Sequence, residues 1–292
     1  MPKSRNPKIE FDKLQIYFQK PYVIDLESAV GSITVKQPTI GDIIEIGESR
    51  FYSTLSVFVT NTTSHRLMLW GEGDKPVVDW NEMSDFELFT LLIANADKEV
   101  YSLFLGDLDL SKFKRVGKNV DEDRQVLVLY DDEDEIEINE EVYWHLSQYL
   151  REMFTIFPEE KITKSPTLKK WYIDKDRRQK KIDEEKAEKG ESESSSLLPV
   201  ISSYLNHPGT KYKSSELKEL GVFEFWDGVQ RLQIYEQATA CMKGMYSGFV
   251  DGSKIKSDSY NFMKEIKHEY VVKDAETYKT NSTTSSKKHK KK

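Results

Sequence analysis

A single stretch, residues 222–246, places apolar side chains three or four residues apart, with polar Thr239 continuing the series. Its apolar positions are Val222, Phe225, Val229, Leu232, Tyr235, Met242 and Tyr246. This spacing is the period of one face of an α-helix, so the stretch predicts one long helix. A shorter segment before it runs from an N-cap at Ser214 to Gly221, and the apolar run 197–205 precedes that segment. Together they predict an all-α unit of three helical pieces.

The long helix carries more large apolar side chains than one face requires. Aromatic and methionine side chains dominate protein-binding surfaces, which makes four residues candidates for partner binding: Phe223, Trp226, Met245 and Tyr246. The simpler interpretation is that all four are buried in the core. Alanine substitution separates the two interpretations. Removing a buried aromatic side chain costs ~3–5 kcal/mol, whereas a surface position stays within about 0.5 kcal/mol of wild-type stability.

The charge distribution excludes several kinds of protein. The chain has a net charge of -7, with an acidic run at residues 131–135 and a basic cluster at residues 287–292. One terminal lysine run does not build a nucleic-acid groove, so nucleic acid is not an expected partner.

The single cysteine, Cys241, cannot form a disulfide or a cysteine-based metal site within one chain. Without a signal-peptide core or the apolar run of about 18 residues that a membrane span needs, we expect a soluble protein in a reducing compartment.

The N-terminal region, residues 1–160, mixes strand and helix signals. Short runs of β-branched and aromatic residues predict strands. These runs are residues 14–18, 22–24 and 32–36. Thr39 and Asp42 then have capping-box spacing, which predicts a helix that breaks near Gly47.

The rest of that region contains stronger local signals. Residues 84–87 form a second capping box before an apolar helix face. Residues 125–130 predict a strand, and the acidic run joins it to residues 136–138 as a hairpin. Asn139 caps a helix that we expect to end at Pro158. The region is therefore predicted to be α+β, with a small antiparallel sheet and helices.

Composition sets the remaining boundaries. Residues 166–189 carry opposite charges three and four apart, which favours a solvated helix, and residues 190–196 have the composition of a flexible linker. A last short helix is predicted around residues 262–266, and the Lys-, Ser- and Thr-rich tail is too polar to bury a core. The predicted units are 1–160 (α+β), 161–196 (charged helix and linker), 197–273 (all-α helical domain) and 274–292 (disordered basic tail).

No pattern in the sequence predicts catalytic chemistry. The acidic run 131–135 has clustered carboxylates of the kind that hold hard cations, but it lacks the register of a calcium loop. Asp107 and Asp109 could pair for acid–base or metal chemistry, although outward-facing carboxylates explain them as well. The five histidines are scattered without metal-ligand spacing. We therefore predict no catalytic residue, no metal site and no cofactor.

Two stretches taken together resemble a known family. Residues 33–44 read ITVKQPTIGDII, and residues 212–232 read YKSSELKELGVFEFWDGVQRL. Both resemble tail-morphogenesis proteins of long-tailed bacteriophages of Gram-positive hosts, above all the tail assembly chaperones, and residues 143–153 have the same character. The resemblance implies a non-enzymatic protein that coats the helical tape-measure protein before the tail tube polymerises. A longer form often arises by ribosomal frameshifting in that family, and the two-part organisation here is compatible with such a form.

The working hypothesis is a phage morphogenesis factor of the host cell cytoplasm that binds tail proteins, the tape-measure protein or the tail tube, through apolar helix surfaces. Self-association stays open, and a membrane is not an expected partner. The first alternative is a structural virion component of the tail or baseplate, in which the same surfaces form a permanent apolar interface. The second is a metal-dependent enzyme that uses Asp107, Asp109 or the run 131–135.

Overall fold

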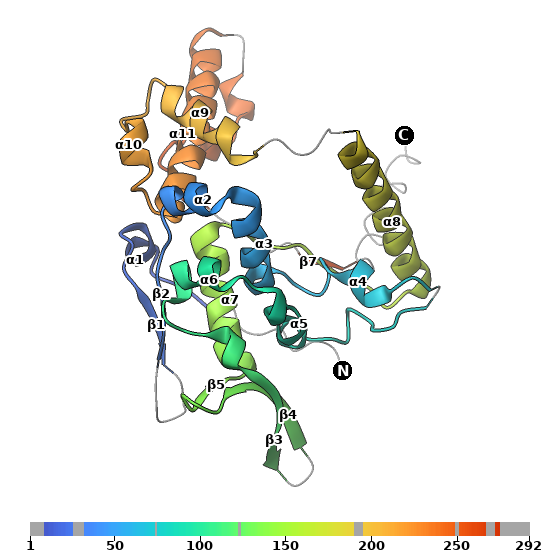
Figure 1. Cartoon of the computed structure of the whole chain (residues 1–292). Coiled ribbons are helices and arrows are strands. Elements are labelled where there is room, and N and C mark those ends of the chain that lie inside the picture. The colour runs from blue at the N-terminus through green and yellow to red at the C-terminus, as the bar shows by residue number, and fades with distance from the viewer. Residues whose placement is uncertain are drawn as a thin grey trace.

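The computed structural model shows an α+β protein, as predicted. Helices dominate it, and its strands form three small separate sheets within the described chain (Figure 1). The structure describes residues 9–25, 32–73, 75–121, 124–189, 195–248, 251–266 and 272–274. Most of the predicted linker (190–194) and the predicted tail after residue 274 lie outside the described residues.

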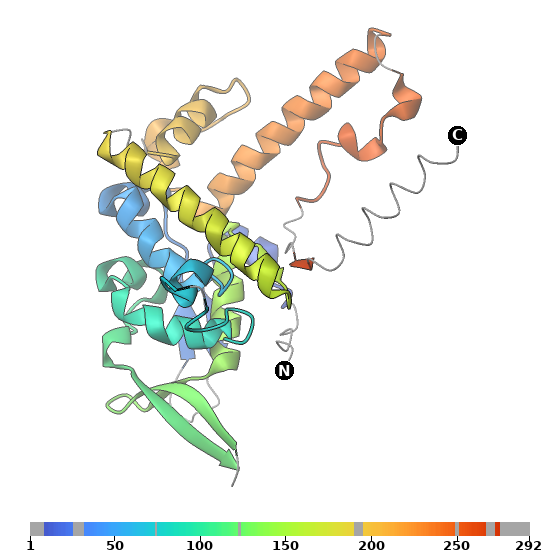
Figure 2. The same ribbon diagram turned by 90° about the vertical axis from the view of Figure 1, so that its right-hand side faces the viewer.

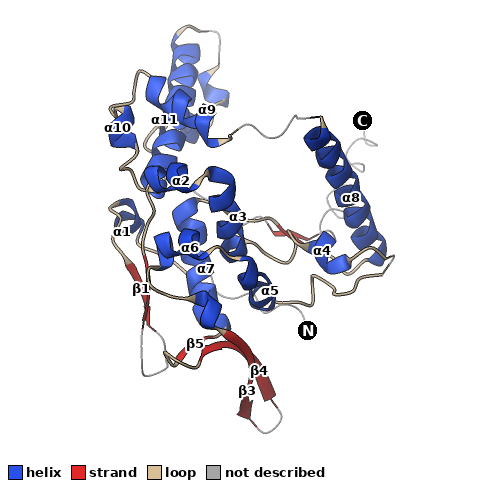
Figure 3. Ribbon diagram, viewed as in Figure 1, coloured by secondary structure: helices blue, strands red, loops and turns tan. Residues whose placement is uncertain are grey.

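The N-terminal region combines two small antiparallel sheets with a group of helices (Figure 3). Its strands are β1 (Tyr22–Asp25), β2 (Ser32–Val35), β3 (Lys114–Asp121), β4 (Arg124–Asp131) and β5 (Ile136–Ile138). Its helices are α1 (Lys13–Tyr17), α2 (Ile40–Ile46), α3 (Glu48–Val59), α4 (Arg66–Trp70), α5 (Asp85–Leu92), α6 (Lys98–Leu105) and α7 (Glu140–Phe154). The strands predicted at residues 22–24 and 32–36 are confirmed as β1 and β2, which pair antiparallel.

The first element is a helix, so the strand predicted at residues 14–18 is wrong. Helix α1 begins after Asp12, whose carboxylate accepts a hydrogen bond from the backbone N–H of Leu14 at 2.9 Å. A capped first turn favours the helix over the extended chain. The apolar side chains of Leu14 and Phe18, which suggested a strand, are each 69% exposed.

The helix starts predicted at Thr39, Ser84 and Asn139 are confirmed, whereas the short helix predicted to be capped by Ser214 has Lys213 as its N-cap. Thr39 and Asp42 make a reciprocal capping box at the start of α2, and the residues at 84–87 make a second one at the start of α5. Gly47 separates α2 from α3 with a φ of 95°, a conformation that favours glycine. Helix α7 ends earlier than expected, because Thr155 adopts the left-handed conformation before Pro158 is reached.

The core of the N-terminal region surrounds α7. Aromatic side chains from α3, α5, α6 and α7 contact one another there, with ring centroids 4.8 to 6.4 Å apart. They are Phe51, Phe58, Phe89, Phe104, Tyr143 and Phe154. The hairpin predicted after residue 125 is confirmed as β4 and β5, and β3 pairs with the other edge of β4. The β3–β4 ribbon extends away from the helices (Figure 2).

The predicted charged helix is confirmed as α8 (Pro166–Glu188). Its first half is held against α4, because Ile173 is fully buried and the Arg66 guanidinium donates two hydrogen bonds of 2.6 Å to Asp176. Every residue from 178 to 189 is exposed to solvent. The two halves therefore differ, since only the first is docked.

The C-terminal half contains the predicted helices. They are α9 (Leu197–Asn206), α10 (Ser214–Leu217) and α11 (Val222–Tyr246). Their apolar side chains join the same buried cluster as the N-terminal region, and Figure 2 shows the second half of α11 extending away from the body. The helix predicted around residues 262–266 is wrong: that segment is irregular, with short 3-10 helices at Gly252–Lys254 and Ser257–Ser259 before it.

After the irregular segment the chain returns to the N-terminal region. Strand β7 (Val272–Asp274) pairs in parallel with β6 (Glu160–Ile162), a strand that directly precedes α8. Sequence analysis did not predict this pairing, because each strand is only 3 residues long.

Candidate partner-binding surface

The two stretches that resemble tail proteins contact each other in the fold. Thr39 and Gly221 form an isolated antiparallel bridge. The N–H of Ile40 donates to the Leu220 carbonyl at 2.9 Å, and the N–H of Val222 donates to the Pro38 carbonyl at 3.1 Å. The first turn of α11 is therefore fixed by backbone hydrogen bonds to the chain that enters α2.

One side chain, Gln37, joins α1 to α11. Its Nε2 donates to the Ile16 carbonyl of α1 at 2.7 Å, and its Oε1 accepts from the N–H of Phe223 at 3.0 Å. That N–H belongs to the first turn of α11, where backbone donors have no partner within the helix. A β-carbon at Gly221 would collide with the Gln37 amide, so a larger residue there would displace Gln37 from these hydrogen bonds.

A second polar contact fixes the start of α9. The Glu48 carboxylate on α3 accepts hydrogen bonds from the N–H groups of Ser196 and Leu197 at 3.0 and 3.1 Å, and from the hydroxyls of Ser195 and Ser196. Burial alone raises the pKa of Glu48, but these hydrogen bonds outweigh it and hold the pKa below its ordinary value. Glu48 therefore acts as an N-cap supplied by another helix.

Between α1 and α11 lies a cleft of about 170 Å³. Glu265 and Ile266 line one side of it, and the buried Phe223 contributes an apolar surface. Its lining residues are Lys13, Leu14, Tyr17, Phe223, Asp227, Arg231, Glu265 and Ile266. We call this site the α1–α11 groove.

Exposed apolar side chains continue from the groove on both sides. Leu14 of α1 and Phe18, which directly follows α1, are each 69% exposed. On the other side, Met263 is 76% exposed, and Phe262 contacts Tyr235 of α11 with ring centroids 6.0 Å apart. Exposed apolar patches rimmed by polar groups are typical of protein-binding surfaces.

Arg231 holds the irregular segment against α11. Its Nη1 donates to the carbonyls of Phe262 and Lys264, at 3.0 and 2.8 Å. On the opposite side of the groove, Lys13 pairs with Glu152 of α7 at 3.2 Å. Both cations that line the groove therefore bind acceptors of the chain itself.

The four residues that the sequence analysis proposed for partner binding do not form one surface. Phe223 is buried at the groove, with its ring centroid 6.4 Å from that of Tyr17. Trp226 is half-buried and packs against the main buried cluster. Met245 is half-buried beside Gly252, and Tyr246 is 89% exposed at the far end of α11.

Four exposed apolar residues of this surface were missed by the sequence analysis: Leu14, Phe18, Phe262 and Met263. The available signal for the first two was Asp12, which predicts a helix start when read as an N-cap. A helix over residues 13–17 would have placed Leu14 and Phe18 four apart on one face. For Phe262 and Met263 no local pattern predicts exposure, because their environment depends on the long-range contacts of Arg231.

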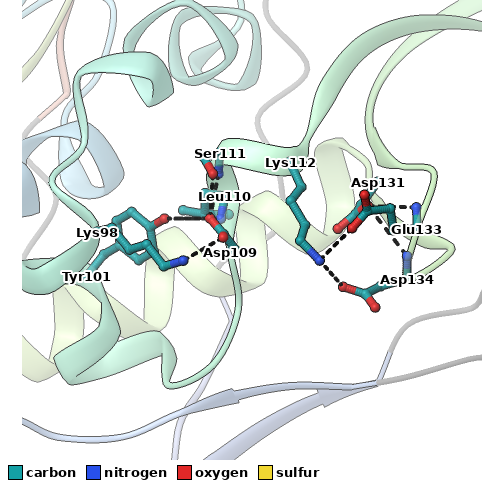
Figure 4. A network of polar contacts seen from close by, with 9 residues as sticks. All are labelled: Lys98, Tyr101, Asp109, Leu110, Ser111, Lys112, Asp131, Glu133 and Asp134. Atoms are coloured by element: carbon teal, nitrogen blue, oxygen red, sulfur yellow. Dashed lines mark hydrogen bonds and ion pairs between the residues drawn. The ribbon is translucent and has the colours of Figure 1, made fainter.

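Four of the acidic groups considered as cation sites, Asp109, Asp132, Glu133 and Asp134, form ion pairs with lysines, three of them drawn in Figure 4. Asp109 accepts hydrogen bonds from Lys98 at 2.5 Å and from the Ser111 hydroxyl at 2.7 Å, and these bonds hold its pKa well below the ordinary value. Lys112 lies 2.9 Å from Glu133 and 3.2 Å from Asp134. Within the described ranges, no group of three or more His, Cys, Asp or Glu side chains is placed to hold a metal ion.

Comparison with known proteins identifies one segment. Residues 188–267 match the family model of the YomV second domain, from a phage-derived protein family of the kind found in SPbeta-like Bacillus phages. No curated protein and no solved structure matches the chain. In the part of the chain that the structure describes, no helix has the length and apolar content to cross a membrane. The matched segment contains α9, α10, α11 and the irregular segment, and it therefore contains one wall of the groove.

Proposed function

We propose that this chain is a non-enzymatic phage tail morphogenesis factor, of the tail assembly chaperone kind, that binds a helix of another tail protein in the α1–α11 groove. The observation that supports the proposal most strongly is the exposed apolar surface on a phage-related segment. Leu14 lines the cleft and is 69% exposed, and Phe18 and Met263, which lie near lining residues in the sequence, are 69% and 76% exposed.

The groove has the features of helix recognition. An amphipathic helix docks by placing apolar side chains, spaced three and four residues apart, into a hydrophobic groove. Leu14 of α1 and Phe18, the C-cap of that helix, lie four residues apart. Side chains with this spacing lie on the same side of a helix, where they can contact such a stripe. Phe223 and Ile266 supply apolar contacts deeper in the cleft. The tape-measure protein, which the resemblance implies as partner, is helical and apolar.

The groove is also preorganised. Gln37 fixes α1 against α11, and backbone hydrogen bonds from Ile40 and Val222 fix the first turn of α11 to the N-terminal region. A surface that is already ordered pays a smaller entropic cost on binding. These links favour binding to helical walls that are already in place.

The test is co-expression of the chain with the tape-measure protein of the same phage, followed by capture and quantitation of the complex. Leu14→Asp should reduce capture by at least about tenfold, the effect of losing a hot-spot contact. The matched control is Leu198→Asp on α9, because Leu198 is also an exposed leucine, at 64%, outside the groove. Equal capture by both variants would contradict the proposal.

Purified particles separate an assembly factor from a virion component. A morphogenesis factor that leaves before maturation should be absent from mature virions at stoichiometric levels and present in infected cells. Its retention in virions would instead support the alternative of a structural tail or baseplate component. In that case the groove would be a permanent interface.

A further inference from the structure

Three charged groups of the α1–α11 groove, Lys13, Arg231 and Asp227, differ in whether they have a partner within the described chain. Arg231 donates to two backbone carbonyls, and Lys13 pairs with Glu152 and lies 4.0 Å from Glu265. Asp227 makes no hydrogen bond and no ion pair with any residue that the structure describes. The groove therefore presents one carboxylate that lacks a partner within the described chain.

A second carboxylate strengthens the negative potential at this position. Glu224 lies one turn before Asp227 on α11, and it accepts a hydrogen bond from the neutral hydroxyl of Tyr212 at 2.9 Å. The pKa of Tyr17, which lines the same groove, is raised by burial and then by the charges of Glu224 and Asp227, and the positive charge of Arg231 only partly opposes this rise. Both carboxylates therefore act on the groove, and neither forms an ion pair with a described cation.

We propose that the groove selects a basic amphipathic helix, one whose apolar stripe contacts Leu14, Tyr17 and Phe223 and whose flanking Lys or Arg pairs with Asp227. This inference rests on the proposed function and specifies its partner. Covering an unpaired carboxylate with an apolar ligand carries a desolvation cost, because the charge loses its water. A basic side chain beside the apolar stripe offsets that cost, whereas an acidic one adds repulsion.

A second copy of this chain is the main competing occupant. Helix α1 itself presents Lys13 beside Leu14 and Phe18, so it carries the same combination of charge and apolar groups. It has only 5 residues, however, and one short helix offers little area for a stable complex. Self-association through the groove would make the sedimentation coefficient depend on concentration, and that dependence would be lost in Leu14→Asp.

The experiment uses two synthetic 18-residue amphipathic helices of identical composition. Both have the same leucine stripe and zero net charge. One has lysines beside the stripe and glutamates on the far face, and the other has these positions exchanged. Fluorescence anisotropy measures the affinity of each peptide for the full chain at low and at high salt.

The lysine-flanked peptide should bind wild type about tenfold more tightly at low salt, and the preference should shrink at high salt as the charges are screened. Asp227→Asn should remove most of the preference, and Asp227→Lys should reverse it. Glu219→Gln is the matched control, because Glu219 is an exposed carboxylate outside the groove. This variant should behave as wild type.

Three outcomes would overturn the inference: no binding of either peptide, equal binding of both, or groove-dependent self-association without peptide binding. If both peptides bind equally and Leu14→Asp abolishes their binding, the groove is still a docking site, but the preference for a basic helix is excluded. The capture of the tape-measure protein described above tests the proposed function separately. If the chain captures that protein but shows no charge preference, the proposed function is supported and this inference is contradicted.

Discussion

Arg151 provides the sharpest test of how the N-terminal region is held together. This arginine of α7 is only 1% exposed. Its Nε donates to the Val59 carbonyl at 2.8 Å, and its Nη2 donates to the Thr60 carbonyl at 2.5 Å. These carbonyls lie at the C-terminal end of α3, where helix acceptors lack partners within the helix. Asp85 of α5 lies 3.6 Å from the same Nη2.

Arg151→Met keeps a long apolar side chain and removes the donors. Two buried carbonyls then lose partners, at ~1–3 kcal/mol each, and Asp85 loses its nearby cation. Breaking a buried charged contact by removing one partner costs ~3–5 kcal/mol in general. We expect Arg151→Met to reduce the free energy of unfolding by about 4 kcal/mol, within that range.

Denaturant unfolding of wild type and variants measures this cost. Arg50→Met is the control, because Arg50 also binds two carboxylates, Asp97 and Glu99, at 2.6 Å, but its side chain is 45% exposed. Exposed ion pairs contribute little to stability. The reasoning would be refuted if Arg151→Met proved no more destabilising than Arg50→Met.

Four further predictions concern the groove, the cap on α9 and the linker. Phe223→Ala should cost ~3 kcal/mol or more in unfolding free energy, and Tyr246→Ala should stay within about 0.5 kcal/mol of wild type. Gln37→Leu should weaken tape-measure capture while circular dichroism shows the helices intact, because it removes the link between the groove walls. The lowered pKa of Glu48 means that its contribution is present above the unfolded pKa of ~4.3 and is lost as pH falls through the folded value. Glu48→Gln should therefore lower the Tm at pH 7 and change it less at pH 3. Limited proteolysis should cut first within residues 190–194; earlier cleavage elsewhere would contradict the linker interpretation.

Local chemistry explains which elements the sequence could predict. The capping boxes that start α2 and α5 were identifiable because both partners lie within four residues of each other. The helix at residues 13–17 was equally local, but the prediction weighed apolar content above the Asp12 cap and was therefore wrong. The irregular conformation of residues 262–266 could not be predicted in this way, because Arg231 holds their carbonyls from 31 and 33 residues away.

The groove shows the same limit more clearly. Phe223 could be proposed from sequence because α11 carries more large apolar side chains than one face requires, but its neighbours in the groove include Leu14 and Tyr17 of α1 and Ile266. The link between the two helices is Gln37, which lies in neither helix and binds both. The phage-related segment, residues 188–267, contains α11 but not α1 or Gln37. A site built in this way belongs to the whole fold rather than to the matched segment. The proposed partner would therefore contact the N-terminal region as well as α11.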